Sequence, residues 1–252
     1  MGQIKKYWVD KATGKYLTKN IDGQDHLLYK WVDGEPEIVY GALYNWYAVI
    51  NENNIASEGW RVPSNWDTYD LLVYLTGGGP GSLDVFGGKL KETGLTYWNS
   101  PNTGATNEVG FNSRGSGYRI NTNGSFAAMK DAVAYLLSNS YSSSEMLCME
   151  HTYNSGYGTY GSIRNKKEGH PVRLIKDSTT LSHGEEGEYV GNDGKKYQTI
   201  CIGTQEWVAE NLIETKYRNG DDIAIVEDDI DWSNLTTGAM CYYDNDINNA
   251  YV

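Results

Sequence analysis

The stretch Asp193-Gly-Lys-Lys-Tyr-Gln-Thr-Ile-Cys-Ile-Gly-Thr-Gln-Glu-Trp-Val-Ala-Glu-Asn-Leu212 decides how this chain folds. Residues 196–202 and 205–208 flank Gly203-Thr204, a two-residue turn with glycine first, and this pattern predicts a β-hairpin. A short helix is expected to follow over residues 209–213. An isolated two-stranded ribbon is only marginally stable in water. The C-terminal segment, residues 188–252, therefore needs a core supplied by residues that come before it.

The earlier part of the chain contains two helical patterns. In residues 40–48, Leu43, Trp46 and Tyr47 have helical spacing, which predicts a short amphipathic helix. A longer helix is predicted to start after Ser64, with Asp67 in the third position of a capping box, and to end at the glycines from Gly77. Its apolar stripe consists of Leu71, Leu72 and Leu75.

Glycine, serine and asparagine punctuate the sequence from Gly87 onward, which is typical of a domain with short strands and long loops. The candidate strands are residues 109–112, 117–120, 134–137 and 170–175. Residues 178–187 are polar and lack periodicity, so we interpret them as a linker.

Several blocks resemble the Fibrobacter succinogenes major paralogous domain family. Tyr40-Gly-Ala-Leu-Tyr-Asn-Trp-Tyr-Ala48 and Gly59-Trp-Arg-Val-Pro-Ser64 are similar to blocks of its closing two thirds. The stretch 193–212 and Tyr242-Tyr-Asp-Asn-Asp246 are similar to blocks of its opening third. The resemblance implies a loop-rich α+β, C-type-lectin-like fold with short twisted antiparallel strands and two main helices. It also implies a circular permutation, because residues 40–177 precede residues 188–252.

Three assemblies are compatible with this reversed order. Residues 188–252 complete the core of their own chain, complete the core of a neighbouring copy by domain swapping, or begin a truncated second repeat. A ten-residue linker reaches at most about 34 Å, which is enough to join ends on the same side of a domain. Exposed strand edges argue against the truncated repeat.

Residues 1–39 contain no block that we match to the family. Their pattern predicts short strands joined by turns, with residues 7–9 against 15–17 and a further strand over 26–32. A segment of this size rarely folds alone. We interpret it as a β-rich arm that attaches the protein to other subunits.

Composition narrows the classes of partner. With 21 basic and 33 acidic side chains the net charge is −12, which disfavours nucleic acid and anionic lipid as partners. No apolar run is long enough for a signal peptide or a membrane span, so no membrane insertion is expected. Cys148, Cys201 and Cys241 are scattered, which predicts buried, reduced thiols.

No catalytic set is visible, so the chain is not expected to be an enzyme. Residues 59–66 also resemble a block of the formylglycine-generating-enzyme group, but the cysteine pair that this oxidase chemistry requires has no match here. No cofactor is expected. Alternating oxygen side chains at Asp244, Asp246 and Asn248 form a weak calcium candidate, and turn capping is the alternative interpretation.

The region before the last candidate strand is rich in tyrosine, serine, asparagine and glycine, the composition of adaptable binding loops. In lectin-like folds this region often forms the ligand face. An ordinary β surface rich in tyrosine and glycine is the alternative. The candidate ligand-binding residues are Asn139, Tyr141, Tyr153, Asn154, Tyr157, Tyr160 and Arg164.

These observations favour a non-enzymatic phage virion protein, a fibre or decoration component that binds a host-surface polysaccharide or glycoprotein. The N-terminal arm would contact other virion proteins, and a homo-oligomer is expected. The location would be the virion, assembled in the host cytoplasm. A bacterial cell-surface adhesin of the same family is the second hypothesis, and a formylglycine-generating-type oxidase is the third.

Overall fold

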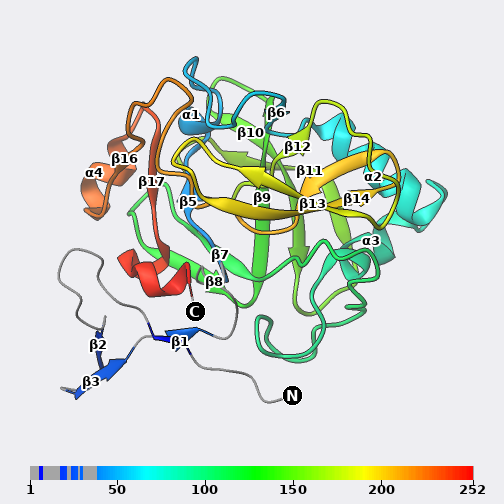
Figure 1. Ribbon diagram of the computed structural model, residues 1–252, viewed down its shortest axis with the longest axis horizontal. Helices are drawn as coiled ribbons and strands as arrows, with labels where there is room; N and C mark the ends of the chain where they lie inside the picture. The colour runs from blue at the N-terminus through cyan, green and yellow to red at the C-terminus, as the bar shows by residue number, and fades with distance from the viewer. Residues whose placement is uncertain (1–5, 8–17, 22–23, 28, 31–38, 252) are drawn as a thin grey trace.

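The computed structural model describes residues 6–7, 18–21, 24–27, 29–30 and 39–251 (Figure 1). In the arm, β1 (Lys6–Tyr7) pairs with β4 (Tyr29–Lys30), and β2 (Thr18–Ile21) pairs with β3 (Gln24–Leu27), both antiparallel. Within the described residues, Tyr7 therefore pairs with Tyr29. The other residues of the predicted hairpin, 8–9 and 15–17, lie outside the described residues.

A five-stranded antiparallel sheet joins segments from distant parts of the sequence. Its order is β13-β14-β15-β12-β6, and Ile175 pairs with both Trp207 and Arg61. The strands are β6 (Trp60–Arg61), β12 (Ile175–Lys176), β13 (Glu186–Val190), β14 (Lys196–Ile202) and β15 (Gln205–Val208). The predicted hairpin is confirmed, with Gly203 at φ +64° in its turn.

A second junction lies at the end of the chain, where β17 (Ala239–Cys241) pairs antiparallel with β5 (Leu43–Tyr44) and parallel with β16 (Ala224–Ile225) (Figure 1). The Asn45 side chain links both segments: its Oδ1 accepts from the main-chain N–H groups of Ala48 and Ala239, each at 3.1 Å. The main-chain N–H of Val39 donates to the Ala250 carbonyl at 2.8 Å. Residues 186–251 thus share their sheets with the earlier segment of the same chain.

The other strands form a three-stranded antiparallel sheet and a hairpin. The sheet contains β9 (Ala132–Ser140), β10 (Glu145–Thr152) and β11 (Gly158–Asn165), in the order β11-β10-β9. The hairpin pairs β7 (Ser116–Arg119) with β8 (Phe126–Met129). Predicted strands over 117–120 and 134–137 correspond to β7 and β9. Residues 109–112 form no strand, and only the end of 170–175 does, as part of β12.

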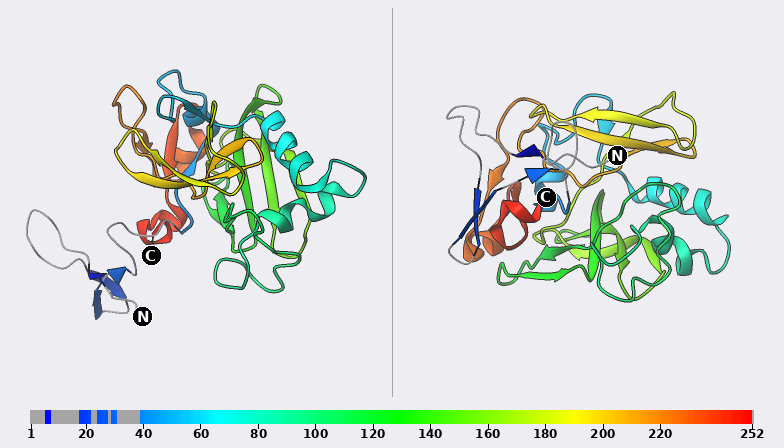
Figure 2. Two further views of the ribbon diagram at one scale, coloured as in Figure 1. Left: turned by 45° about the vertical axis from the view of Figure 1, so that its right-hand side comes forward. Right: turned by 60° about the horizontal axis from the view of Figure 1, so that its bottom comes forward.

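Four α-helices complete the body: α1 (Trp46–Val49), α2 (Asn65–Thr76), α3 (Ser82–Leu90) and α4 (Asp229–Asn234). Two single 3₁₀ turns, η1 (Tyr243–Asn245) and η2 (Ile247–Asn249), follow near the end of the chain. Helices α2 and α3 pack on β10 and β11 (Figure 2). Across the part of the chain that the structure describes, no helix has the length and apolar content to cross a bilayer.

The capping box of α2 is confirmed, because the Ser64 side chain accepts from the Asp67 N–H and the Asp67 side chain accepts from the Ser64 N–H. The helix ends at Gly77, at φ +78°. The helix predicted over 40–48 begins only at Trp46, since Leu43 and Tyr44 pair with β17.

The helix predicted over 209–213 is wrong. The main-chain N–H groups of Ala209 and Leu212 donate to carbonyls of Gln198 and Val172, so the segment is irregular and is held between its neighbours. The linker predicted over 178–187 also ends early, because β13 starts at Glu186.

The largest core cluster draws on both segments. It combines Tyr44 and Trp46 with Tyr189, Tyr197 and Met240, all buried. The three cysteines are buried and unpaired, as predicted. Burial raises the pKa of Cys148 well above its ordinary value and that of Cys241 to about 12, so both thiols are protonated at neutral pH.

Glu214 gives the body a pH-dependent stability. Its buried carboxylate accepts from the main-chain N–H groups of Asn192, Asp193 and Lys216 at 2.5, 3.0 and 3.1 Å. Burial, reinforced by the neighbouring Asp193, raises the Glu214 pKa to about 7. Between about pH 4.3 and about pH 7, Glu214 is therefore protonated in the folded chain, whereas in the unfolded chain, where its pKa is about 4.3, it has lost this proton.

We expect this group to lower the free energy of unfolding as the pH rises from about 4.3 to about 7, and to contribute no further change above that range. Glu214→Gln cannot titrate, so it should lose this component of the slope. Urea midpoints of both proteins at pH 5 and pH 7.5 provide the measurement. If the urea midpoint changed by the same amount between pH 5 and pH 7.5 in both proteins, the result would contradict the assignment.

Candidate functional site

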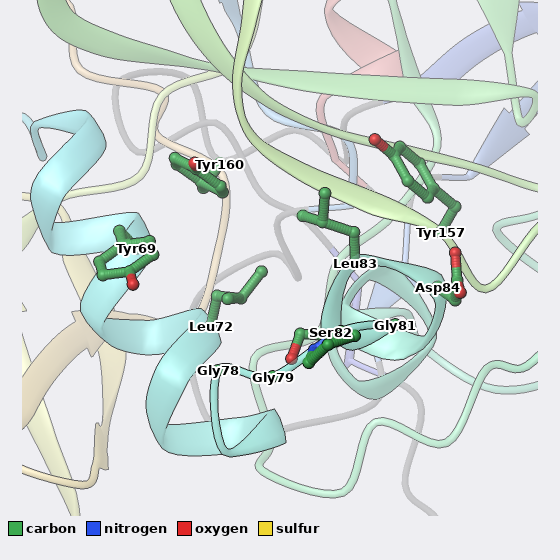
Figure 3. Close-up of a pocket in the computed structure, with 11 residues that line it drawn as sticks. Tyr69, Leu72, Gly78, Gly79, Gly81, Ser82, Leu83, Asp84, Tyr157 and Tyr160 are labelled. Carbon is green, nitrogen blue, oxygen red and sulfur yellow. The ribbon is translucent and has the colours of Figure 1, made fainter.

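A surface hollow of about 340 Å³ lies where α2, α3 and β11 meet (Figure 3). Aromatic and aliphatic side chains form its walls, and the glycine-rich connection between the two helices forms its rim. The lining residues are Tyr69, Leu72, Gly78, Gly79, Pro80, Gly81, Ser82, Leu83, Asp84, Tyr157 and Tyr160. We call this hollow the aromatic groove.

Tyrosine rings dominate the groove. The rings of Tyr69 and Tyr160 lie 5.3 Å apart, edge to face, with Tyr157 on the other side of Leu83 (Figure 3). Trp66 extends the aromatic surface, because its ring lies 6.0 Å from that of Tyr69 and the residue is 67% exposed. Tyr157 is 42% exposed. Rings held at this level of exposure can stack on a ligand and still offer polar tips to water.

The N-terminal part of α2 is rigidly anchored. Arg61 donates two hydrogen bonds to the Asp67 carboxylate, at 2.6 and 2.7 Å. The Asp67 side chain also completes the capping box. Gln205, from the β14–β15 hairpin, donates through Nε2 to the Asp67 carbonyl at 3.0 Å. Thr68 Oγ1 lies 2.9 Å from the Tyr160 carbonyl and donates to it, tying α2 to β11. The C-terminal segment thus supports the helix that carries Trp66 and Tyr69.

The opposite wall depends on a close approach between α3 and the loop before β11. A Cβ on Gly87 would lie 2.4 Å from the Tyr157 carbonyl oxygen, so only glycine fits there. The Gly88 N–H donates to the Gly156 carbonyl at 2.9 Å. These contacts fix the main chain next to Tyr157.

Lys91 also binds the loop before β11 through its side chain. Its ammonium is fully buried and donates to the carbonyls of Thr103, Thr152 and Ser155 at 3.0, 2.8 and 2.8 Å. Burial lowers the Lys91 pKa to about 8. The loop that presents Tyr157 is therefore fastened at both ends, and the groove is preformed.

The structure brings two of the seven predicted ligand-binding residues into the groove, Tyr157 and Tyr160. Asn139 lies at the start of α2, where its Oδ1 accepts from the Asn65 N–H at 2.8 Å. Tyr141 is 60% exposed but lies outside the groove lining. Asn139 therefore serves α2, and Tyr141 is a separate exposed ring.

The other three residues also lie outside the lining. The Tyr153 ring packs against the core, as the rings of Tyr69 and Tyr160 also do in part, but it does not line the groove. Asn154 is exposed beside Thr152. Arg164 forms an ion pair with Glu150 at 2.6 Å and does not line this groove, so its role in ligand binding stays a prediction.

Sequence reasoning missed the residues that α2 and α3 contribute. Trp66, Tyr69 and Leu72 follow one another at three-residue spacing, which places them on one helix face. This spacing could have marked α2 as a binding wall. Leu83 and Asp84 had no comparable pattern, because α3 was not predicted.

The other candidate site in the sequence is the possible calcium site at residues 244–248. Among residues 39–251 and the described parts of the arm, no group of three or more His, Cys, Asp or Glu side chains is placed to hold a metal ion. At the calcium candidate, Asp246 Oδ1 accepts from the main chain and the amide of Asn248, at 2.9 and 2.6 Å, and caps η2. Asp244 is exposed at φ +54°. Calcium binding here stays a prediction.

A comparison with protein-family models matched residues 3–176 to the Fibrobacter succinogenes major domain. Searches of curated proteins and of solved structures returned no match. The match starts at residue 3, so our interpretation that residues 1–39 lie outside the family is wrong. It ends before residues 188–252, whose similarity to the opening third stays a prediction. Because the match covers more than half of the sequence, the chain belongs to the Fibrobacter succinogenes major domain family.

Proposed function

We propose that this protein is a non-enzymatic recognition module, and that the aromatic groove binds a glycan or protein on a bacterial surface. The observation that carries the proposal is the set of tyrosine rings from α2 and β11 around one preformed hollow, with the exposed Trp66 beside it. Small-molecule sites are typically concave, mostly apolar and preformed, with a few polar groups that orient the ligand. The groove has each of these properties.

The setting we propose is a phage virion, as a fibre or decoration protein with a C-type-lectin-like domain in permuted order. Support for the permuted order comes from the hydrogen bond between Val39 and Ala250, which places the end of the later segment next to the start of the earlier one. The N-terminal arm would contact other virion proteins, and the assembly would be a homo-oligomer.

Replacement of both facing rings, Tyr69→Ala with Tyr160→Ala, should weaken ligand binding by at least tenfold. Each stacked ring contributes roughly 0.5–1.5 kcal/mol beyond its buried area, and 1.4 kcal/mol corresponds to a factor of ten. A microarray of bacterial surface polysaccharides and glycoproteins measures the change.

Tyr141→Ala is the matched control, because it removes an exposed tyrosine outside the groove. Far-UV circular dichroism checks that both variants fold. Binding that survives in the double variant, or that Tyr141→Ala weakens equally, would place the recognition site elsewhere.

A further inference from the structure

The aromatic groove offers an unusual charge environment for a surface-recognition site. Among its lining residues, Asp84 alone carries a charge, and it is exposed. No lysine or arginine belongs to the lining. The nearby Lys89, on α3, already pairs with Glu108 at 2.5 Å. An anionic ligand would therefore meet a carboxylate and find no cation in the lining.

The tyrosine rings also favour uncharged ligands over anionic ones. The face of an aromatic ring carries negative electrostatic potential. It attracts the weakly positive C–H groups on the apolar face of a sugar ring, and it repels a carboxylate or sulfate. The net charge of −12 adds a long-range repulsion against polyanions.

The polar groups of the groove suit hydroxyl groups. Asp84 is an acceptor-only group when ionised, so it can accept from two neighbouring hydroxyls. The rim from Gly78 to Gly81 contains three glycines and Pro80, so it presents main chain with few side-chain atoms. At about 340 Å³ the hollow lies at the low end of small-molecule sites, which range over roughly 300–1,000 Å³. It fits a short stretch of a chain better than a large folded epitope.

We propose that the ligand of the aromatic groove is an uncharged hexose chain, whose apolar sugar faces stack on Tyr69, Tyr160 and Tyr157 while its hydroxyls donate to Asp84. This inference rests on the proposed function, because it names the ligand class of the same groove. The same charges should make polymers of uronic or sialic acid weaker ligands of the groove.

Isothermal titration calorimetry of the full chain tests the inference in 0.15 M NaCl, a concentration at which charges are screened over about 8 Å. The probes are neutral hexose oligomers, namely hexamers of β-linked glucose and of mannose, and a hexamer of galacturonic acid of equal length. A mixed hexapeptide library is the protein-like probe. We expect a neutral hexamer to bind at least tenfold more tightly than the acidic one, and to lose at least tenfold in affinity in the Tyr69→Ala, Tyr160→Ala double variant.

Asp84→Asn should reduce the difference in affinity between the neutral and the acidic hexamers, because it removes the repelling charge and keeps the side chain's shape. If the protein binds the acidic hexamer or the peptides, and the double variant abolishes this binding, the proposed ligand class is wrong. The groove would then still be the recognition site. Binding of a neutral hexamer that the double variant does not weaken, or no binding of any probe, would overturn the groove itself and with it the proposed function.

Discussion

Deletion of residues 186–252 should abolish cooperative unfolding. The truncation removes three of the five strands of the antiparallel sheet and leaves only β12 and β6, each of two residues, paired with each other. It also removes large buried side chains from the core, among them Tyr189, Tyr197, Trp207 and Met240. Burying one large apolar side chain contributes about 1.5–3 kcal/mol. The loss of four is comparable with the whole stability of a domain, about 5–15 kcal/mol.

Near-UV circular dichroism and urea titration measure this result. The truncated chain should lose its near-UV signal and show no sigmoidal transition, whereas the full chain shows both. A truncated chain with the full chain's urea midpoint would show that the earlier segment has a complete core of its own.

Arg119→Met should lower the free energy of unfolding by about 2–6 kcal/mol, because two main-chain carbonyls lose their donor at a cost of about 1–3 kcal/mol each. The Arg119 guanidinium is fully buried between the rings of Phe126 and Trp232. It donates to the carbonyls of Gly124, Val226 and Glu227 at 2.7, 2.6 and 2.7 Å. Methionine fills part of the space but leaves the Gly124 and Val226 carbonyls without this donor, whereas the Glu227 carbonyl keeps a hydrogen bond from Asn245 Nδ2 at 2.8 Å. Acceptors that lose their donor away from water are costly.

Asp229→Asn is the matched control for this substitution. Asp229 accepts from the same guanidinium at 2.9 Å, but its side chain is 54% exposed. A solvent-exposed partner contributes little, so we expect a change of about 1 kcal/mol or less. Urea denaturation of the three proteins gives the comparison. Equal losses in both variants would show that the ion pair dominates, and that the bonds to the carbonyls contribute little.

Two local features were predicted correctly from local sequence patterns. The Ser64–Asp67 capping box and the glycine turn at Gly203 depend on residues within a few positions of each other, and both occur as predicted. Residues 209–213 failed because their conformation is set by distant partners. Asn211 accepts from Arg173 at 2.7 Å and donates to the Tyr40 carbonyl at 2.8 Å, so tertiary contacts hold this segment in a non-helical form.

The candidate site was predictable only in part, for the same reason. Composition indicated Tyr157 and Tyr160, because a segment rich in tyrosine and glycine is recognisable without its neighbours. On the facing wall, the spacing of Trp66, Tyr69 and Leu72 marks one face of α2, but how α3 packs beside that face, and with it the place of Leu83, is not revealed by any local pattern. The partner of Arg164 is likewise set by tertiary structure, because Glu150, which pairs with it, lies on the adjacent strand.

The central claim is that residues 39–251 form one body from two segments whose order in the chain is immaterial to the fold. The direct test is a reordered chain in which residues 178–252 come first and a short Gly-Ser linker joins them to residues 39–177. The Val39–Ala250 hydrogen bond places the new junction within reach of a short linker, and the new ends fall at the exposed Asp177 and Ser178. We predict one cooperative urea transition and the near-UV spectrum of the original protein. A reordered chain that stays unfolded, in conditions where the original folds, would contradict the claim.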